Sequence, residues 1–383
     1  MTLRAHVAVD ARMVRHSGIG VYIRSLLPLL AARAPEWRFS VMGPVGALED
    51  LEWRPGSDVA LVPTQVPIYS VREQFQVPLT IPTHSDALWV PHYNIPLLYR
   101  GPLVVTIHDV LHLAQPYLGG GFHRRVYSRT MFRAVARKAD RILAVSDFTR
   151  RELIRLTSVN PGKVRRVHNG VGAEWFETAA DRARPEPYVV YVGNVKPHKN
   201  VGVLLSAFSK AVQYVPHRLL IVGQYAGFWD AQPELLEAAK QSTRVEFLGT
   251  VPDRELRSLV GGAEALVLTS LYEGFGLAPL EAMACNCPVL VSRCGSLPEV
   301  CGDAAVYCDA RDPDDVSVQL LRLLTDEPLR RELRRRGRAR AASFTWEACA
   351  DQTLSAMAEV LQRLPPPVDP SVGNVESRSE GDK

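Results

Sequence analysis

Two glutamates separated by seven residues, Glu273 and Glu281, lie on either side of a glycine-containing turn. One apolar run precedes the turn at residues 265–269, and another follows at residues 288–292, as expected for two strands. Pro279 marks the start of a helix between them, with Glu281 in its first turn. Free backbone N–H groups at the turn and the helix start suit phosphate, whereas carboxylates suit hydroxyl groups. A nucleotide sugar offers both kinds of group.

The two glutamates, with Gly-Phe-Gly between them, resemble the signature of the retaining glycosyltransferases of family 4, which have the GT-B fold. The resemblance implies that Glu273 holds hydroxyls of the donor sugar and that Glu281 holds the ribose of the nucleotide. The N–H groups of Phe275, Gly276 and Leu277 are expected to face the same crevice and to bind the diphosphate. A helix whose early glutamate only complements the helix dipole is the alternative interpretation.

The resemblance implies an α/β architecture with two Rossmann-like domains, whose parallel sheets face each other across a cleft, and a C-terminal helix that crosses back. The length of 383 residues also favours two domains. We expect an acceptor-side domain over residues 1–181, a nucleotide-sugar domain over 188–343, a cross-over helix over 344–362 and a disordered tail over 365–383. The charged, proline-containing segment 182–187 is the expected linker. Short apolar runs predict strands at 7–10, 39–42, 59–62, 87–90, 103–107, 142–146 and 164–167, and then at 188–192, 219–222, 245–248, 265–268, 289–291 and 305–307.

A second glycine-containing turn, Gly18-Ile-Gly20, lies between the first predicted strand and a helix predicted over residues 21–32. A glycine turn at such a junction lets a diphosphate approach the backbone. Two glycines are also common at a turn with no ligand. The resemblance implies that Gly18 and Gly20 close over the donor phosphates and partly line the acceptor site.

His108 and Asp109 follow the strand predicted at residues 103–107, a β-branched apolar run typical of a parallel strand covered on both faces. Ligands collect outside the carboxyl ends of such strands, so we expect His108 in the crevice. A histidine that only caps the strand is the alternative. The resemblance implies that His108 contacts the donor sugar near the reacting carbon. We place Asp109 on the acceptor side, together with His92 and Tyr93 from the polar segment that follows the fourth strand.

Lys199 lies in the loop after the first strand of the second domain. The resemblance places it on the donor diphosphate, where a lysine provides positive charge that no metal need supply. The family often has arginine just after the glycine of this loop, but this chain has Asn194. We therefore expect Lys199 to be the main cation, with Asn194 as a neutral residue of the donor site.

No metal site and no cofactor are expected. The pair Asp312 and Asp314 could suggest a metal, but Asp312 precedes Pro313 and an apolar helix, which is the pattern of a helix cap. The six cysteines include no Cys-x-x-Cys pair and fit small buried thiols. The nucleotide sugar would be a substrate.

The formal charge of +4 does not argue for nucleic acid, and no run reaches the length of a membrane-spanning helix. The first residues lack the apolar core of a signal peptide, so we expect a cytoplasmic protein. A basic helix is predicted over Phe122–Arg141. Its arginines indicate either a solvated face or a peripheral contact with the anionic inner face of the membrane.

The predicted reaction is transfer of a sugar from a nucleotide-sugar donor to a glycan or lipid-linked acceptor, with retention at the anomeric carbon. Lys199, the Gly18–Gly20 loop and the helix at Pro279 would stabilise the leaving diphosphate, and Glu273 would position the sugar. Whether the reaction passes through a covalent intermediate stays open. The His-Asp pair and the Lys199 loop most resemble members that move mannose from GDP-mannose in polysaccharide or O-antigen synthesis. A UDP-sugar donor, a nucleotide-sugar epimerase and a non-catalytic sugar-binding protein are the alternatives.

Overall fold

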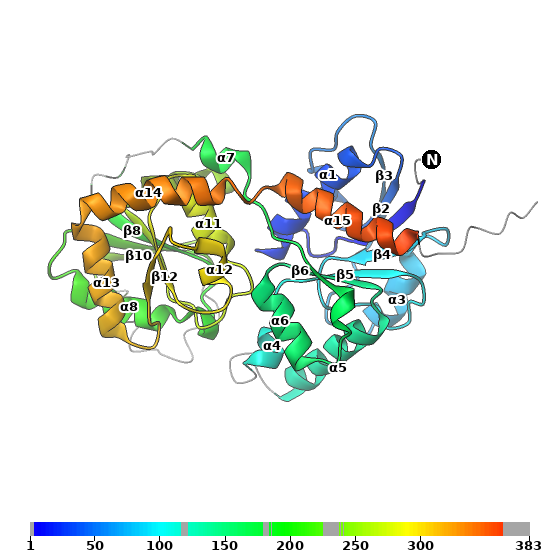
Figure 1. Ribbon diagram of the computed structural model, residues 1–383, viewed down its shortest axis with the longest axis horizontal. Helices are drawn as coiled ribbons and strands as arrows, with labels where there is room; N and C mark the ends of the chain where they lie inside the picture. The colour runs from blue at the N-terminus through cyan, green and yellow to red at the C-terminus, as the bar shows by residue number, and fades with distance from the viewer. Residues whose placement is uncertain are drawn as a thin grey trace, which may run out of the picture.

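The computed structural model describes residues 4–115, 122–178, 184, 186–224, 237, 239 and 241–362, and it contains two parallel β-sheets. Each sheet belongs to its own half of the chain, and the two halves lie next to each other (Figure 1). We call them the N-terminal unit and the C-terminal unit. The predicted disordered tail and residues 182, 183 and 185 of the predicted linker lie outside the described residues.

Seven strands form the first sheet in the order β3-β2-β1-β4-β5-β6-β7, and all neighbours are parallel. Strands β2 and β3 follow β1 toward one edge of the sheet, and strands β5, β6 and β7 follow β4 toward the other edge. The switch point therefore lies between β1 and β4, where Val7 pairs with Ala87. Ligands bind outside the carboxyl ends of the strands at such a point. The strands are β1 (His6–Asp10), β2 (Arg38–Gly43), β3 (Asp58–Pro63), β4 (Ala87–Val90), β5 (Leu103–Ile107), β6 (Arg141–Ala144) and β7 (Val164–Arg166).

Six strands form the second sheet in the order β10-β9-β8-β11-β12-β13, again all parallel. Its switch point lies between β8 and β11, where Ala265 pairs with Val189. The inner strands of both sheets are short, apolar and buried among crossover helices, which explains their continuous runs of valine, leucine and isoleucine, whereas the edge strands β3 and β10 are half-buried. The strands are β8 (Tyr188–Val192), β9 (Arg218–Val222), β10 (Val245–Gly249), β11 (Ala265–Leu268), β12 (Val289–Ser292) and β13 (Val306–Cys308).

Helices connect the strands and cover the sheets (Figure 1). Those of the N-terminal unit are α1 (Ile19–Arg33), α2 (Val45–Glu49), α3 (Glu73–Thr80), α4 (Leu111–Ala114), α5 (Phe122–Lys138), α6 (Asp147–Leu156) and the short η1 (Pro161–Lys163), and α7 (Ala173–Phe176) follows. Those of the C-terminal unit are η2 (Pro197–Lys199), α8 (Val201–Ala211), α10 (Asp253–Gly262), α11 (Leu277–Ala284), α12 (Leu297–Cys301), α13 (Pro313–Thr325) and α14 (Glu327–Ala341).

The last helix, α15 (Trp346–Leu361), crosses back from the C-terminal unit to the N-terminal one (Figure 1). Trp346, Met357 and Val360 are buried in the same apolar cluster as residues of β1 and α1. The ring of Trp346 packs at 5.9 Å from that of Tyr22 on α1. The predicted cross-over helix is therefore present, and it ties the two units together through apolar burial.

The predicted strands all form, with ends within two residues of the prediction, but three predicted helix boundaries are wrong. Helix α1 begins at Ile19, so Gly20 is helical. Helix α5 ends at Lys138, because Arg141 already pairs with Val104 in the sheet. Helix α11 begins at Leu277, directly after Gly276 turns the backbone with φ of 101°, so Glu281 lies in its second turn.

Candidate functional site

The carboxyl edges of the two sheets touch where the loop after β11 meets the loop after β5. A Cβ atom added to Gly274 would lie 1.9 Å from the carbonyl oxygen of His108, so only glycine permits this approach. The same added atom would lie 2.8 Å from Cβ of Asp109. The residue after Glu273 thus packs directly on the predicted His-Asp pair, which comes from the other unit.

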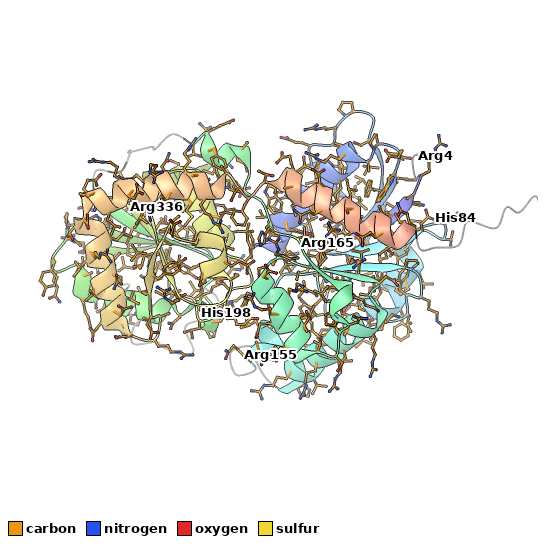
Figure 2. The ribbon with its side chains drawn as sticks, viewed as in Figure 1. Arg4, His84, Arg155, Arg165, His198 and Arg336 are labelled. Atoms are coloured by element: carbon orange, nitrogen blue, oxygen red, sulfur yellow. The ribbon has the colours of Figure 1, made fainter. Side chains whose placement is uncertain are left out.

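Lys199 and Glu273 form an ion pair within this contact region. The Nζ atom of Lys199 lies 2.6 Å from Oε1 of Glu273. Ser270 donates a second hydrogen bond of 2.6 Å to the same oxygen. Lys199 ends the short helix η2, and Leu271 donates its backbone N–H to the carbonyl of His198 in that helix, which fixes the two loops together. His198 lies on the side of the C-terminal unit that faces the N-terminal one (Figure 2).

The loop that carries Glu273 is fixed by the segment after β12. The hydroxyl of Ser296 donates to the carbonyl oxygens of Glu273 and Phe275, at 3.1 and 2.8 Å. A Cβ atom on Gly295 would lie 2.3 Å from the Glu273 carbonyl oxygen, which shows how closely the two backbones approach. No side chain caps the helix that follows, α11. The N–H groups of its first turn, for which an anion was predicted, therefore have no side-chain cap as partner.

Glu281 lies on α11, about one turn from the start of the helix. Burial and, to a smaller extent, the nearby carboxylates of Glu174 and Asp253 raise its pKa to about 8. The side chain is therefore largely protonated at neutral pH. A half-buried carboxyl group without a cation beside it suits hydroxyl groups as partners, in line with the predicted ribose contact.

His108 is held as a neutral ring. Burial lowers its pKa to about 4. Its Nε2 lies 2.9 Å from the carbonyl oxygen of Pro91, so Nε2 carries the proton and donates it, which leaves Nδ1 as an acceptor. The ring of Tyr22 packs edge-on against it at 4.8 Å. Asp109 accepts a hydrogen bond of 2.9 Å from the N–H of Leu111, at the start of α4.

The Gly18–Gly20 turn meets the Lys199 loop across the contact between the units. Asn194 donates a hydrogen bond of 3.0 Å to the hydroxyl of Ser17, and its Oδ1 accepts one of 3.3 Å from the N–H of Gln224. Both ends of the Asn194 amide are thus engaged by protein. A Cβ atom on Gly20 would lie 2.6 Å from the Val14 carbonyl oxygen, so this glycine is required by packing inside its own loop.

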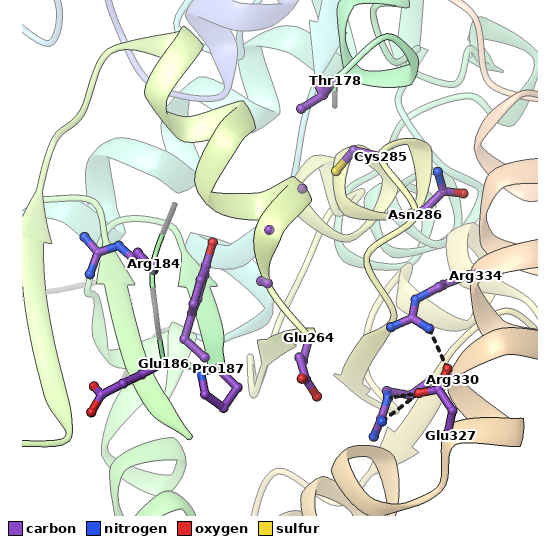
Figure 3. Close-up of a pocket in the computed structure, with 14 residues that line it drawn as sticks. Thr178, Arg184, Glu186, Pro187, Glu264, Cys285, Asn286, Glu327, Arg330 and Arg334 are labelled. Carbon is purple, nitrogen blue, oxygen red and sulfur yellow. Dashed lines mark hydrogen bonds and ion pairs between the residues drawn. The ribbon is translucent and has the colours of Figure 1, made fainter. Parts of the chain in front are cut away.

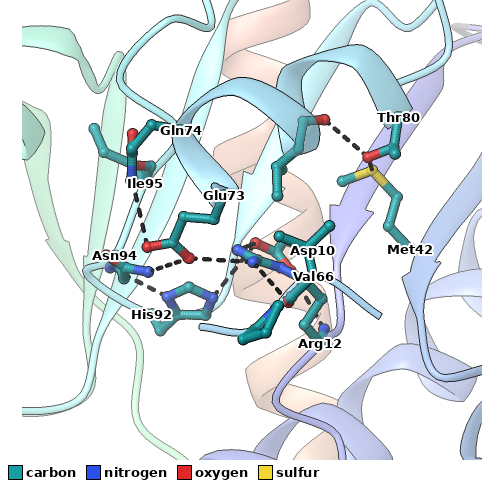
Figure 4. A network of polar contacts seen from close by, with 12 residues as sticks. Asp10, Arg12, Met42, Val66, Glu73, Gln74, Thr80, His92, Asn94 and Ile95 are labelled. Atoms are coloured by element: carbon teal, nitrogen blue, oxygen red, sulfur yellow. Dashed lines mark hydrogen bonds and ion pairs between the residues drawn. The ribbon is translucent and has the colours of Figure 1, made fainter. Parts of the chain in front are cut away.

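A buried polar network lies at the switch point of the first sheet, where the acceptor side was predicted (Figure 4). Arg12 donates to both carboxylate oxygens of Asp10, at 2.8 and 2.7 Å, and to Glu73 at 3.1 Å. Asn94 also donates to Glu73, at 2.8 Å. Burial raises the pKa of Asp10, but hydrogen bonds from Arg12 and His92 outweigh it, so Asp10 is held ionised.

The two other predicted acceptor-side residues lie within or beside this network. His92 accepts from the N–H of Asn94 at Nδ1, at 3.1 Å, and its Nε2 lies 3.5 Å from Asp10. At 1% exposure, His92 is buried within this network. Tyr93 is half-buried and stacks on Phe132 of α5 at 4.7 Å.

Sequence reasoning missed several residues that build the site. Asp10 ends a strand at the switch point, and that position could have identified it. Glu73 gave no signal, because α3 is short, contains Pro78 and was not predicted. The contacts of Ser146, Ser296 and Glu299 depend on tertiary packing alone.

The prediction that Asp312 caps a helix is confirmed, because its side chain accepts a hydrogen bond from the N–H of Asp314 at the start of α13. No group of three or more histidine, cysteine or acidic side chains is arranged to hold a metal within the part of the chain that the structure describes. All six cysteines are free thiols, and five are buried while Cys294 is half-buried.

A cavity of about 570 Å³ opens elsewhere in the C-terminal unit (Figure 3). It lies beside Pro187 and Glu264, which directly precede β8 and β11, and hence at the amino ends of these strands. Its arginines are paired, since Arg330 and Arg334 both contact Glu327, at 2.7 and 3.1 Å. The donor site predicted from the sequence lies at the opposite, carboxyl edge.

Two family descriptions match the chain. "Glycosyltransferase Family 4" matches residues 17–175, and "Glycosyl transferases group 1" matches residues 176–340. O-antigen chain mannosyltransferase B of Escherichia coli is 33% identical over 287 residues, which cover 71% of this chain and 73% of that protein. The serotype-specific mannosyltransferase WbdA of the same species is 30% identical over 301 residues, 73% of this chain but only 36% of that longer protein.

Solved structures share the fold at lower identity. Sucrose-phosphate synthase from Thermosynechococcus elongatus superposes with a TM-score of 0.76 at 22% identity, over 94% of this chain and 100% of that one. WaaG, a glycosyltransferase involved in lipopolysaccharide biosynthesis, superposes with a TM-score of 0.69 at 17% identity, over 91% and 98%. The predicted GT-B architecture is confirmed by these likenesses.

Proposed function

The chain belongs to the retaining glycosyltransferases of family 4, and we propose that it moves mannose from GDP-mannose to a glycan or lipid-linked acceptor. The observation that carries the transferase part is the contact of Gly274 with His108, which brings the Lys199–Glu273 pair beside the His-Asp pair of the other unit. The choice of mannose is supported by the names of the two relatives reported above, both of which are mannosyltransferases.

Each residue of the site has a role in this reaction that its geometry suits. Lys199 and the uncapped start of α11 would stabilise the diphosphate as negative charge develops on it. Glu273, fixed by Lys199 and Ser270, would orient hydroxyls of the sugar. Neutral His108 offers Nδ1 as an acceptor to another donor hydroxyl. Glu281 would hold the ribose.

The acceptor would enter from the N-terminal unit, over the buried network of Asp10, Arg12 and Glu73. Such a network keeps its polar groups in fixed positions, since breaking one partner of a buried ion pair costs about 3–5 kcal/mol. Tyr93 and Asp109 border the same region. We propose that these groups together shape the acceptor pocket.

We also propose peripheral contact with an anionic membrane on the cytoplasmic side. Four arginines at intervals of four residues share one face of α5 and form what we call the arginine stripe: Arg125, Arg129, Arg133 and Arg137. Next to it lies an apolar groove of about 470 Å³, lined by residues of α5, of the segment before α3 and of the segment after β4, including Tyr69, Val71, Leu97, Val126 and Met131. Large apolar side chains are exposed nearby, with Val71 at 79% and Phe75 at 59%.

The apolar contribution to membrane contact differs from the one expected from the basic helix alone. Met131, Phe132 and Val135 are buried in the core. Among the large apolar residues of α5 whose side chains the structure describes, Val126 is the exposed one. Lys138 donates to the carbonyls of Leu97 and Tyr99, so its ammonium group is already engaged by protein. No helix among the described residues is both long and apolar enough to cross a membrane.

A donor panel tests the proposed reaction. Purified protein is incubated with GDP-mannose, GDP-glucose, UDP-glucose and ADP-glucose, with and without an acceptor glycan, and release of nucleoside diphosphate is measured. Acceptor-dependent release of GDP from GDP-mannose supports the proposal. Preference for a UDP-sugar would replace mannose with the alternative donor. Conversion of the donor without acceptor would identify an epimerase, and binding without turnover would identify a sugar-binding protein.

A further inference from the structure

Glu299 of the C-terminal unit receives the start of helix α6 from the N-terminal unit. Its Oε1 accepts a hydrogen bond of 2.7 Å from the N–H of Asp147, and its Oε2 accepts one of 3.0 Å from the N–H of Phe148. Both groups lie in the first turn of a ten-residue helix, where backbone N–H groups have no partner inside the helix. A carboxylate at this end is also favoured by the helix dipole.

His168 completes the contact from the segment that leads out of the N-terminal unit. Its Nε2 lies 2.8 Å from Oε1 of Glu299, and Arg166 donates to the Nδ1 of the same ring at 3.0 Å. Because an ionised carboxylate can only accept, Nε2 carries the proton that is donated to Glu299. Burial alone would raise the pKa of Glu299, but the hydrogen bonds from His168, Asp147 and Phe148 outweigh that effect. The net result is a lowered pKa, so Glu299 is ionised at neutral pH.

The same end of α6 also holds the loop of the first glutamate. Ser146 caps α6 by accepting from the N–H of Thr149, and it donates its own proton to the carbonyl oxygen of Gly274, at 2.6 Å. The hydroxyl of Thr149 donates to that carbonyl as well, at 3.0 Å. The start of α6 therefore binds the C-terminal unit at two points, Glu299 and Gly274.

These contacts determine where Glu273 lies relative to His108. Gly274 packs on the His108 carbonyl with no room for a Cβ atom, and its own carbonyl is held by Ser146 and Thr149. Glu299 is itself anchored, because Arg340 donates to its carbonyl oxygen at 2.5 Å and to that of Val300 at 2.8 Å. A separation of α6 from Glu299 would free the Gly274 contact at the same time.

We infer that Glu299 is a positioning residue of the transferase, which holds the start of α6 on the C-terminal unit and so keeps Glu273 and His108 together. The inference rests on the proposed function for its kinetic and GDP-binding readouts, and the scattering readout is independent of it. Glu299 touches neither of the two residues itself. Its effect passes through Asp147, Phe148 and the Ser146–Gly274 hydrogen bond.

The test compares Glu299→Ala and Glu299→Gln with Glu332→Gln as the matched control. Glu332 is also an ion-paired glutamate of the C-terminal unit, but its partners Arg335 and Arg336 lie on its own helix. Small-angle X-ray scattering reports the separation of the units, and calorimetry with GDP reports the nucleotide site. We expect Glu299→Ala to increase the radius of gyration and to lower kcat at least tenfold, with the Kd for GDP unchanged within twofold.

Glu299→Gln keeps one oxygen that can accept one of the two N–H groups, so its kcat should lie between those of Glu299→Ala and the wild type. If Glu299→Ala does not fold, Glu299→Gln alone must show the separation and the loss of turnover. A wild-type radius of gyration or wild-type kcat in the folded variants overturns the inference. So does a loss of GDP affinity in proportion to turnover, because Glu299 would then act inside its own unit. If the wild type transfers no sugar, the proposed function fails, and the scattering comparison still decides the inference without substrate.

Discussion

The ammonium group of Lys199 lies 2.6 Å from the carboxylate of Glu273, and the two residues come from the loops after β8 and β11, on either side of the switch point of the second sheet. One residue is the predicted cation for the diphosphate, and the other is the predicted contact for sugar hydroxyls. Their pairing fixes both side chains before any substrate has to order them, which lowers the entropic cost of forming the reactive arrangement.

Replacement of Lys199 by Met should lower kcat by roughly 100- to 1000-fold, because a positioned group that stabilises developing charge typically contributes that much. Lys199→Arg should retain part of the activity, since the positive charge remains. The measurement is release of nucleoside diphosphate at saturating donor. Lys210→Met is the control, because Lys210 is also an ion-paired lysine of the C-terminal unit, with Asp314 as its partner. Equal activities for Lys199→Met and the control would exclude the predicted role.

The affinity for GDP should rise with pH up to about 8. Glu281 binds a proton below its raised pKa of about 8, whereas a carboxylate that accepts two ribose hydroxyls is favoured in its ionised form. Protons therefore compete with the nucleotide, and binding near neutral pH should release a proton. Calorimetry in two buffers with different ionisation enthalpies measures that release.

Glu281→Gln separates this effect from the titration of GDP itself, because only the wild type should release the extra proton. Glu281→Ala should weaken GDP binding by about 1–3 kcal/mol, the cost of a lost hydrogen bond to a charged group. Glu174→Gln removes a neighbouring negative charge and should move the pH dependence to lower pH. A wild-type Kd that follows the same pH course as that of Glu281→Gln would contradict the ribose assignment.

The strands were predictable because buried parallel strands are short apolar runs. The location of His108 and Lys199 was predictable as well, because polar residues that follow such strands fall at the carboxyl edge of the sheet. The bond between Asn194 and Ser17 was not predictable. It joins residues 177 positions apart, and no local pattern encodes such a pairing. Asn194 was expected as a neutral residue of the donor site, and its amide bridges the two loops.

The acceptor side was less predictable than the donor side. Its network needs Glu73 from α3, a helix with proline inside it and with apolar residues exposed, so neither periodicity nor burial marks it in the sequence. His92 was predicted on the acceptor side, and its burial could not be read from a segment of mixed polar and aromatic residues. Such positions depend on which distant element covers them.

Transfer should persist in EDTA. Lys199 and the start of α11 supply the positive potential at the predicted diphosphate site, and the Asp312 pair that could have bound a metal is a helix cap. The measurement is the initial rate with and without excess chelator, followed by addition of magnesium or manganese. Loss of activity in EDTA that either ion restores would show that the reaction needs a divalent metal.

Binding to membranes should depend on the arginine stripe and on salt. Each basic residue near an anionic surface contributes about 1 kcal/mol, so changing Arg129, Arg133 and Arg137 to Gln should weaken binding about a hundredfold at low ionic strength. The exposed apolar residues beside the groove, among them Val71 and Phe75, should add a contribution that salt does not screen.

Co-sedimentation with vesicles of phosphatidylglycerol and phosphatidylethanolamine, compared with vesicles of phosphatidylcholine alone, measures both contributions. The control is a variant with Arg322, Arg331 and Arg335 changed to Gln, because it loses the same charge from the C-terminal unit. Binding that falls with salt in the wild type and the control, and is weak in the stripe variant, supports the proposed surface. Equal binding to anionic and neutral vesicles would exclude specific contact with an anionic membrane. Equal loss of binding in both variants would show that net charge, and not the arginine stripe, is responsible.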